Sequence, residues 1–558
     1  MQKIILFLFL FFNISIYSQT SFNSKELKVT RADLELNVYE KDSTANALVL
    51  YEYGKSYIDN NDYSLKTEEK RKIKILNREG FNKANVTIYL RKSDDRKEKV
   101  KNIIATTYNL VDGKVSATKL SDTHIFEEKY NDDFTLIKFT LPNIKEGSVI
   151  NYSYTLQSPF KFNYQGWSFQ SDIPKLYSEY NTSIPAHYEY HLKLAGLLKL
   201  DINDSAIESF CLQVNGGGHA DCTISKYAMR DVPAFIEEDY MTTKDDYLAK
   251  ITYELNTVKQ FDGRIDKISK TWKDVDKELK TDSRIGKQLK VNISNDAFNG
   301  ESDLLKRAEN IYSHVQKTYT WNESFNLFGD NSVKDLMKNK SGNVAEINML
   351  LHNLLKENDI TVSPVLLSTR NNGFATKLFP IISEFNYLIV QVTINNESYL
   401  LDATDNYLSF GELPFRCLNQ RGRLLDFKKG SSWIDITPKN ISTIQYKIDL
   451  KLEDNNQLTG KMNQVATGYH ALPLKEDYYS NKTEYVNKYK EKYADITFSN
   501  HEVTSKNKTS YKFIEGFDIA FATEEIGGNI YLNPFLFKLL EENPLKFCNK
   551  SITKSLYH

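Results

Sequence analysis

Cysteine is scarce in this chain, with four residues among 558, at Cys211, Cys222, Cys417 and Cys548. So few cysteines exclude a disulfide-rich scaffold, in which many bridges replace a hydrophobic core. An excess of one charge is also missing, because 72 Lys and Arg oppose 73 Asp and Glu. Since no basic stripe stands out to neutralise phosphates, we expect no nucleic acid among the partners.

Long apolar runs are equally scarce, and the one clear run lies at the start. Lys3 precedes a nine-residue apolar stretch from Ile4 to Phe12, and cleavage after Ser18 would leave a small residue at the cut. This pattern predicts a signal peptide at residues 1–18, with a buried N-terminal helix as the alternative. No later stretch reaches the roughly 18 apolar residues of a membrane span, and no cysteine follows the predicted cut to carry a lipid. We therefore expect export to the periplasm, the outer-membrane surface or the medium.

Aromatic residues are abundant, with 35 Tyr and 31 Phe, and they favour pleated, half-buried surfaces. Residues 34–229 contain successive alternating segments, including 84–90, 136–141 and 149–156, separated by turn signals such as Asp112-Gly113. This region predicts an antiparallel β-sandwich-like domain. It resembles the DUF3857 domain that precedes transglutaminase-like cores in exported bacterial proteins. The motifs that carry the resemblance are Trp167-Ser-Phe-Gln170, Asp172-Ile-Pro174 and Glu179-Tyr-Asn-Thr-Ser-Ile-Pro185.

Two of the cysteines flank a glycine-rich loop in this domain. Cys211 and Cys222 lie on either side of residues 214–219, which would close a hairpin. An exported chain meets an oxidising compartment, so a disulfide between them is one expectation and two separate thiols the other.

The pattern becomes helical from residue 242 to about 317, for example at residues 265–272 and 304–312. A stronger helix signal follows, because Val344, Ile347 and Leu351 belong to one apolar stripe, and Asn343 with Glu346 forms a capping-box pattern. Strands are expected at residues 362–367, 385–394 and 399–402. Residues 242–427 thus predict a helical lead-in and an α+β core. Short strands with a helix near 475–492 then predict a C-terminal β-sandwich-like domain at 435–545, shorter than the domains it resembles.

The core resembles the transglutaminase-like superfamily, which shares a papain-like α+β fold. The segments that carry the resemblance are Ser341-Gly-Asn-Val-Ala-Glu-Ile-Asn348, Glu384-Phe-Asn-Tyr-Leu-Ile-Val390 and Tyr399-Leu-Leu-Asp-Ala-Thr404. In that family a Cys starts the helix, a His lies on the next strand and an Asp on the strand after. The matching positions here are Val344, Tyr387 and Asp402, so the resemblance implies a site without its nucleophile and base.

These replacements argue against acyl transfer, because Val344 has no nucleophilic atom and a tyrosine phenol, with a reference pKa of ~10, is a weak base. The Tyr387 hydroxyl could donate to Asp402, it could stack in the old cleft and contact a partner, or Val344 and Tyr387 could simply fill the space. The candidate ligand-binding residues are Trp321, Asn343, Glu346, Asn386, Tyr387 and Asp402.

Other constellations are weaker. Cys417 does not start a helix, which makes it a structural or free thiol rather than a substitute nucleophile. His187, Glu189 and His191 would share one face of a strand, as zinc ligands can, but a solvated polar face explains them better. Asp402, Asp405 and Glu412 do not match a calcium loop. We therefore expect no metal and no cofactor.

Taken together, these features predict an exported α+β multidomain protein with a non-catalytic core. The expected role is that of a binding or scaffold protein of the cell envelope, with a peptide, a glycan or an envelope protein as partner. One alternative is an enzyme that uses unrecognised residues, for example a hydrolase or acyl transferase. The other is a purely structural envelope component, which predicts a filled cleft and an apolar surface patch.

Overall fold

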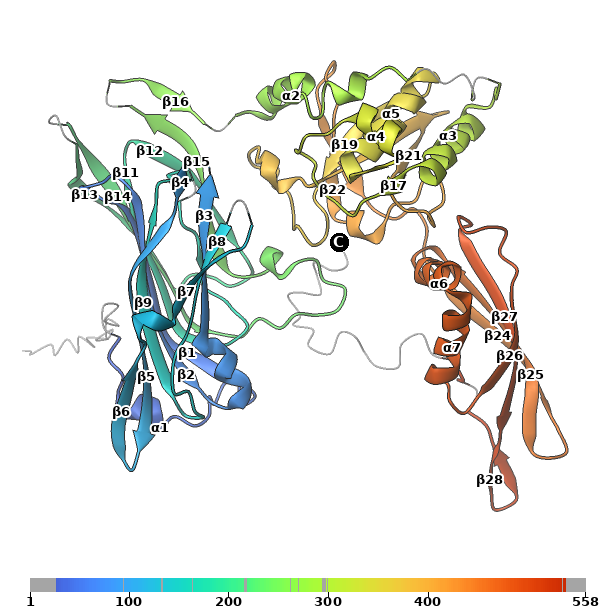
Figure 1. The fold of residues 1–558 in the computed structure, drawn as a ribbon, viewed down its shortest axis with the longest axis horizontal. Helices are drawn as coiled ribbons and strands as arrows, with labels where there is room; N and C mark the ends of the chain where they lie inside the picture. The colour runs from blue at the N-terminus through green and yellow to red at the C-terminus, as the bar shows by residue number, and fades with distance from the viewer. Residues whose placement is uncertain are drawn as a thin grey trace, which may run out of the picture. The chain divides into compact units, whose positions relative to one another are not determined.

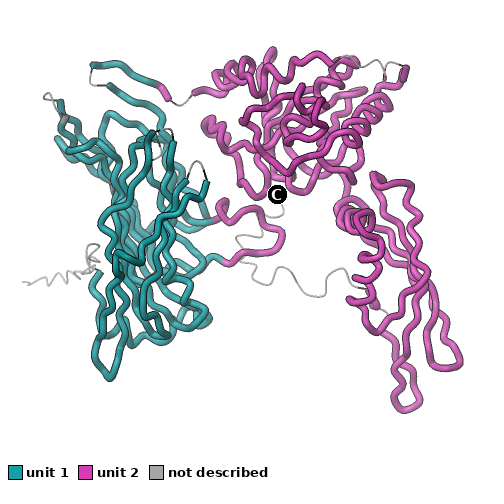
Figure 2. The backbone as a smooth tube through the Cα atoms, viewed as in Figure 1, with its two compact units in different colours: residues 1–235, 248–266 teal, residues 236–247, 267–558 magenta. Residues whose placement is uncertain are grey.

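The computed structural model describes residues 27–537 except 94, 132–133, 163, 215–217, 261, 269, 294–297, 299 and 534. The predicted signal peptide and Cys548 lie outside these residues. The chain divides into two compact units, one of residues 1–235 with 248–266 and one of residues 236–247 with 267–558 (Figure 2). The first unit consists mainly of strands, and the second combines helices with strands. None of the helices in the described residues has the length and apolar character that a membrane span requires.

The first unit is built around an eight-stranded sheet in the order β13-β14-β11-β1-β2-β9-β5-β6. The strands are β1 (Ala47–Ile58), β2 (Leu65–Ile75), β5 (Lys99–Val111), β6 (Lys114–Lys119), β9 (Val149–Ser158), β11 (Lys175–Pro185), β13 (Ile202–Val214) and β14 (Gly218–Val232). β1 and β11 pair in parallel, which corrects the expectation of a wholly antiparallel domain. Parallel pairing needs a long connection, and the strands between β1 and β11 supply it.

Two smaller sheets pack on this sheet. One has the order β4-β3-β8-β7, from β3 (Asn85–Ser93), β4 (Arg96–Lys97), β7 (Ile125–Lys129) and β8 (Phe134–Thr140). The other joins β10 (Trp167–Ser168), β15 (Lys250–Lys259), β12 (Tyr188–Ala195) and β16 (Ile265–Lys267). Val49 and Phe139 share one buried cluster, and Met229 and Ile251 share another, so each small sheet has its own interface with the large one. The short helix α1 (Arg31–Glu35) buries Leu34 in a separate cluster.

β15 and β16 correct the prediction of a helical segment from residue 242. Residues 250–259 alternate between buried and more exposed positions, which is a strand pattern, and β15 pairs with both β10 and β12. Residues 265–267 extend the same sheet, and the helix begins only at Trp272. Tertiary pairing therefore overrides the apolar spacing on which the helical prediction rested.

The core of the second unit places a helix on a five-stranded antiparallel sheet (Figure 1). The sheet order is β21-β20-β19-β22-β23, from β19 (Thr361–Leu367), β20 (Tyr387–Ile394), β21 (Glu397–Leu401), β22 (Gln420–Leu424) and β23 (Ser432–Ile436). The helices are α2 (Trp272–Thr281), α3 (Leu304–Thr318), α4 (Val333–Asn339) and α5 (Val344–Glu357). β17 (Thr320–Trp321) pairs in parallel with β18 (Ser341–Gly342) just before α5.

Helix α5 is the centre of this core, and it confirms the helix start predicted from the capping box. Ile347, Leu350 and Leu354 pack against Leu388, Val390 and Val392 of β20 in one buried cluster. Because side chains alternate along a strand, Tyr387, Ile389 and Gln391 point to the other face of β20. That face carries the candidate site at one end and a cavity further along.

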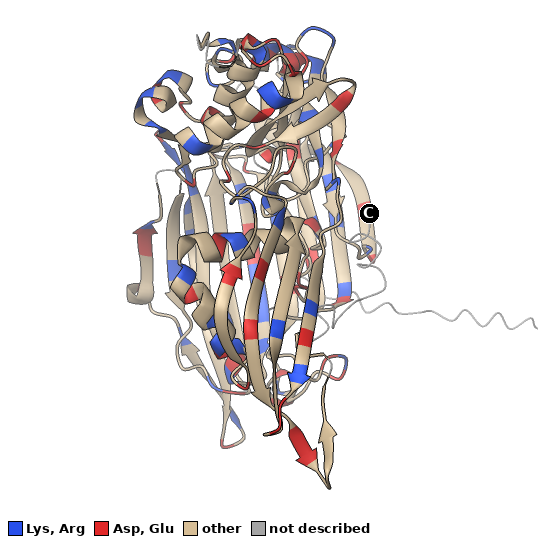
Figure 3. Cartoon of the chain, turned by 90° about the vertical axis from the view of Figure 1, so that its right-hand side faces the viewer, with Lys and Arg blue, Asp and Glu red and all other residues tan. Residues whose placement is uncertain are grey.

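The rest of the second unit is a sheet in the order β24-β25-β27-β26 with two helices. Its elements are β24 (Ile444–Leu452), β25 (Gln457–Thr467), α6 (Gly468–Ser480), α7 (Lys482–Lys492), β26 (Thr497–Val503) and β27 (Lys512–Ala522), followed by the hairpin of β28 (Glu524–Ile526) and β29 (Asn529–Tyr531). The predicted single helix is two, because the chain breaks at Asn481, which caps α7. Basic and acidic residues are interspersed along these strands and helices, as the blue and red segments of Figure 3 show.

Candidate functional site

The start of α5 is held by hydrogen bonds that occupy two of the predicted ligand-binding residues. The Asn343 side chain accepts from the Glu346 amide at 3.0 Å, and the Glu346 carboxylate accepts from the Asn343 amide at 2.9 Å. The other Glu346 oxygen accepts from the Ser332 amide at 3.0 Å, and Asn343 Nδ2 donates to Asn331 at 2.8 Å. Both side chains therefore stabilise the turn into the helix, which is their position in a capping box.

Val344 is the first residue of α5 and is 1% exposed. It belongs to a buried cluster with Val365, Leu367 and Tyr387. A helix N-terminus carries the positive end of the dipole and would lower the pKa of a thiol at this position. An isopropyl group cannot use that field, so here it contributes only packing.

The side chains of Tyr387 and Asp402 are in contact, and Tyr387 shares a buried cluster with Val344. Tyr387 begins β20 and Asp402 follows β21, and both side chains are fully buried, at 0% exposure. The Tyr387 hydroxyl donates to Asp402 Oδ2 at 2.6 Å, and Thr404 Oγ1 lies 3.2 Å from the same hydroxyl. Burial raises the pKa of Tyr387 well above its ordinary value, and the Asp402 carboxylate raises it further. The phenol is therefore neutral at physiological pH and cannot act as a base.

The second oxygen of Asp402 is satisfied by two further groups. Asn348 Nδ2 donates to Oδ1 at 3.0 Å, and the Thr404 amide donates to the same oxygen at 3.0 Å. Asn348 also donates to the Leu388 carbonyl at 2.8 Å and accepts from the Ala403 amide at 3.0 Å. The buried carboxylate is thus bonded to the helix, the strand and the following turn, as a buried charge requires.

Arg416 supplies the positive charge next to this carboxylate, and sequence reasoning gave it no role. Its Nε donates to the Tyr387 hydroxyl at 3.0 Å and its Nη2 to Thr404 Oγ1 at 2.7 Å. The guanidinium also lies over the Trp321 ring, 4.4 Å from its centre. Tyr387 therefore links the arginine to Asp402 by accepting from one and donating to the other.

Trp321 and Phe325 pack against this group, Trp321 on Arg416 and Phe325 on Tyr387. The Trp321 indole donates to the Ser324 carbonyl at 3.0 Å, and Phe325 packs on Trp321 and Tyr387 with ring-centre distances of 5.4 and 5.8 Å. Phe325 is 40% exposed, so it lies at the surface above the buried tyrosine. Asn386, also predicted to contact a ligand, forms two hydrogen bonds of 2.9 Å with Thr369.

Cys417 is the free cysteine of the described residues, and it lies beside the same carboxylate. Its Sγ is 3.8 Å from Asp402 Oδ2, and the side chain is fully buried. Burial raises the pKa of the thiol well above its ordinary value, and the Asp402 charge adds to the effect. A buried neutral thiol is a poor nucleophile, so Cys417 acts as a small core residue here.

Of the two members that were missed, Asn348 had a signal in the sequence and Arg416 had none. Asn348 lies four residues after Val344, so a polar side chain interrupts the buried face of α5 and needs buried partners. Arg416 precedes Cys417 in a short 3-10 turn, Phe415–Cys417, and its approach to Tyr387 depends on tertiary folding alone.

The other predicted positions lie elsewhere. Cys211 and Cys222 form a disulfide between β13 and β14, with 5.7 Å between their Cα atoms. Glu189 forms an ion pair with Lys259 on the neighbouring strand. Across the described part of the chain, no three His, Cys, Asp or Glu side chains are grouped so that they could hold a metal ion.

Comparison with known proteins gives one domain match. Residues 61–207 match DUF3857, described as a domain of unknown function with a solved structure. No curated protein matches the chain. A candidate protease from Parabacteroides distasonis is 11% identical with a TM-score of 0.44, over 86% of this chain and 93% of that one.

Two further solved structures are similar at lower scores. A candidate cysteine protease from Cytophaga hutchinsonii is 9% identical with a TM-score of 0.16, over 67% of this chain and 86% of that chain. Leukotriene A4 hydrolase from Saccharomyces cerevisiae is 10% identical with a TM-score of 0.18, over 38% of this chain and 30% of that chain. These scores are too low to transfer a fold or an activity, so the site is interpreted from its own geometry. The chain carries a DUF3857 domain at residues 61–207.

Proposed function

We propose that this chain is a non-catalytic, transglutaminase-like protein of the cell envelope that binds a peptide, glycan or protein partner. The observation that carries the proposal is the buried hydrogen bond between Tyr387 and Asp402, with Val344 packed at the helix start in front of it. In an acyl-transfer site these three positions need a thiolate, an imidazole and a carboxylate that orients it. Here the carboxylate orients a neutral phenol.

The electrostatics around Asp402 support a structural role for the group. An oriented carboxylate beside an imidazole would stabilise a positive charge formed during the reaction. Asp402 instead accepts from Tyr387, Asn348 and the Thr404 amide, and Arg416 already supplies a permanent positive charge one hydrogen bond away. Tyr387 and Cys417, whose pKa values are raised by burial, stay protonated at neutral pH, so neither supplies the base that acid–base catalysis requires.

Restoring the two replaced residues tests the proposed correspondence with a catalytic core. We expect the thiol introduced in the variant carrying Val344→Cys and Tyr387→His, with Cys417→Ala and Cys548→Ser to remove other free thiols, to be ionised already at about pH 6. Because this position is 1% exposed, ionisation is followed by the ultraviolet absorbance of the thiolate, which needs no access for a reagent. The helix N-terminus and the adjacent imidazole would both favour the thiolate.

The matched control for this test is Val333→Cys in the same background. Val333 also starts a helix, α4, and is also fully buried, but it belongs to a different buried cluster from the one that contains Tyr387. If the thiol of the restored pair ionises at no lower pH than that of the Val333 variant, the three positions do not correspond to a catalytic triad and the proposal loses its basis.

Export is tested separately. The proposal predicts a mature protein that begins at Gln19 and is recovered from the periplasmic, outer-membrane or secreted fraction. N-terminal sequencing of the fractionated protein gives the cut directly. An uncut chain in the cytoplasmic fraction would contradict the envelope location.

A purely structural envelope component is the second candidate. It is favoured by the filled site and by apolar side chains at the edge strand β6. Leu110 and Val115 pair across β5 and β6 and are 38% and 51% exposed. A self-associating chain that binds no separate partner in pull-down experiments would favour this candidate.

A further inference from the structure

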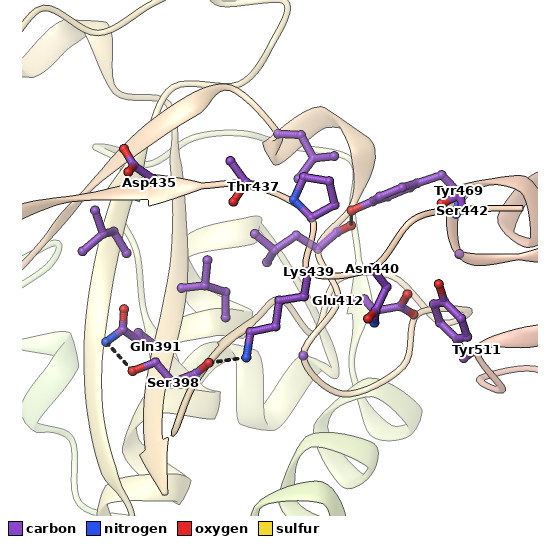
Figure 4. A pocket seen from close by; sticks show the side chains of 17 residues that line it. Gln391, Ser398, Glu412, Asp435, Thr437, Lys439, Asn440, Ser442, Tyr469 and Tyr511 are labelled. Carbon is purple, nitrogen blue, oxygen red and sulfur yellow. Dashed lines mark hydrogen bonds between the residues drawn. The ribbon is translucent and has the colours of Figure 1, made fainter. Parts of the chain in front are cut away.

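A second feature of the core lies apart from the Tyr387–Asp402 group. A cavity of about 220 Å³ opens within the second unit, between the five-stranded sheet and the segments that begin the C-terminal sheet domain. Its lining residues come from β20, β21, residues 411–413, Leu418, β23, residues 437–440, Ser442, the start of α6 and Tyr511 (Figure 4). Val344, Tyr387 and Asp402 are not among the described residues that line it.

The floor of the cavity is the face of the sheet that points away from the α5 core. Leu400 and Ile434 pack at the margin of the cluster that contains Tyr387 and Ile389, and Gln391 continues that face of β20. The floor is therefore apolar with an amide at one side. Gln391 and Ser398 share a hydrogen bond of 3.5 Å there.

Two tyrosines with fixed rings stand at the other end. The Tyr469 hydroxyl donates to the Leu413 carbonyl at 2.8 Å, and the Tyr511 hydroxyl donates to the Ile441 carbonyl at 3.2 Å. The Tyr469 amide is bonded to Ser442 Oγ at 2.9 Å. Since the hydroxyls are tied to the backbone, the rings are held in place and offer rigid aromatic surface at little entropic cost.

Planar polar side chains lie beside these rings. In Figure 4, Asn440 and Glu412 are grouped with Tyr511, and Asp435 and Thr437 lie toward the opposite end. Amide and carboxylate groups can each form two hydrogen bonds in one plane, which suits neighbouring hydroxyls on a ring. The cavity thus combines an apolar floor, aromatic rings and convergent polar groups, as small-molecule sites do.

Charge and size restrict the ligand further. Two carboxylates, Glu412 and Asp435, line the cavity with a single ammonium, and Lys439 already donates to the Ser398 carbonyl at 2.6 Å. Arg421, which is not a lining residue, lies 3.5 Å from Asp435, so the cavity has no excess of positive charge. This balance disfavours an anion. The volume of about 220 Å³ corresponds to about seven water molecules at ~30 Å³ each, which is the scale of one sugar ring.

We infer that this cavity binds one uncharged pyranose unit of a glycan. A pyranose has an apolar face of C–H groups and a rim of hydroxyls, and these match the tyrosine rings and the planar polar side chains. The inference rests on the proposed binding role and names the chemical class of its ligand. It places the ligand away from the filled site.

The test is saturation-transfer NMR of the full chain with three sugars of one ring shape. At about 10 mM, D-glucose should receive saturation from the protein, and D-glucuronate should bind at least about fivefold more weakly because its carboxylate meets Glu412 and Asp435. D-Glucosamine separates the effect of negative charge from that of any altered substituent on the ring, since its positive charge should not weaken binding. Trialanine serves as a peptide probe of similar size.

Two variants place the sugar in the cavity. Asn440→Ala should weaken D-glucose binding about fivefold by removing one hydrogen-bonding side chain. Thr437→Trp should abolish binding because the indole fills the space. Asn463→Ala is the matched control, because Asn463 is an exposed asparagine on β25 that does not line the cavity, and it should bind as the unchanged chain does.

Each remaining outcome overturns the inference. These are no transfer to D-glucose, transfer that survives both cavity variants, tighter binding of D-glucuronate, or binding of trialanine in place of the sugars, which would make this a peptide site. A failure here leaves the proposed lack of catalysis standing, because thiol ionisation and turnover test that separately.

Discussion

Replacing Tyr387 by phenylalanine removes one hydroxyl from a fully buried network and changes little else. Asp402 Oδ2 loses its 2.6 Å donor and retains only the weak Cys417 thiol at 3.8 Å. Arg416 Nε loses the acceptor that it contacts at 3.0 Å. The ring itself stays, so the packing against Val344 and Phe325 is preserved.

The size of the effect follows from the charges involved. Hydrogen bonds to charged groups contribute about 1.5–3 kcal/mol each, and a buried acceptor left without a donor costs a similar amount. Asp402 is completely buried and cannot recruit water, whereas Arg416 is only half-buried and can. We therefore expect Tyr387→Phe to lower the free energy of unfolding of the core by about 3 kcal/mol.

Urea denaturation followed by tryptophan fluorescence measures this change. Three of the four tryptophans, Trp272, Trp321 and Trp433, lie in or against the core of the second unit. The midpoint should fall while the slope of the transition stays the same. Tyr399→Phe is the control, because it removes a hydroxyl bonded to Glu397 on the surface of the same sheet and should leave the midpoint unchanged.

A midpoint for Tyr387→Phe equal to that of the unchanged chain would refute the reasoning. It would mean that the Tyr387–Asp402 bond contributes nothing to the fold. The group would then be free to serve a ligand or a reaction, and the structural interpretation of the old site would fail.

Three further outcomes are expected. Burial lowers the pKa of His352 to about 4 from its ordinary 6.5, so the unfolded state binds the proton first and the core should lose up to about 3 kcal/mol as pH falls from 6.5 to 4. His352→Gln should reduce that loss, as urea midpoints at about pH 7 and about pH 4.5 would show. Replacing Cys211 and Cys222 together by serine opens a loop with a sequence separation of 11 and should destabilise the first unit by up to about 3 kcal/mol, while the urea midpoint of the second unit, which holds three of the four tryptophans, stays unchanged. Cys417 should resist iodoacetamide in the folded chain and react once urea unfolds it, which mass spectrometry would detect, and modification of the folded chain would contradict its burial.

Helix α5 was predictable because its signals are local. The capping box of Asn343 and Glu346 and the stripe that includes Ile347 and Leu351 depend only on residues within a few turns of one another. Strand β20 was equally clear from its apolar run. The convergence of Val344, Tyr387 and Asp402 came from a family resemblance and could not be derived from spacing.

The parts that escaped prediction depend on distant partners. Strand β15 escaped prediction because it lies in a charged stretch in which the sequence also shows helical spacing of apolar residues. The strand is selected by its pairing with β12, which the sequence does not reveal. The parallel pairing of β1 with β11 joins residues more than a hundred positions apart. Arg416 reaches Tyr387 and Trp321 from a turn with no pattern of its own.

The central claim is that the core does no chemistry at the Val344, Tyr387 and Asp402 positions, and a turnover assay tests it most directly. The full chain would be incubated with casein and a fluorescent primary amine, and both peptide cleavage and amine incorporation would be followed. The account predicts no turnover above a heat-denatured control. Turnover that is lost in Cys417→Ala or Tyr387→Phe, with the fold retained, would show that this group is an active site and would contradict the account.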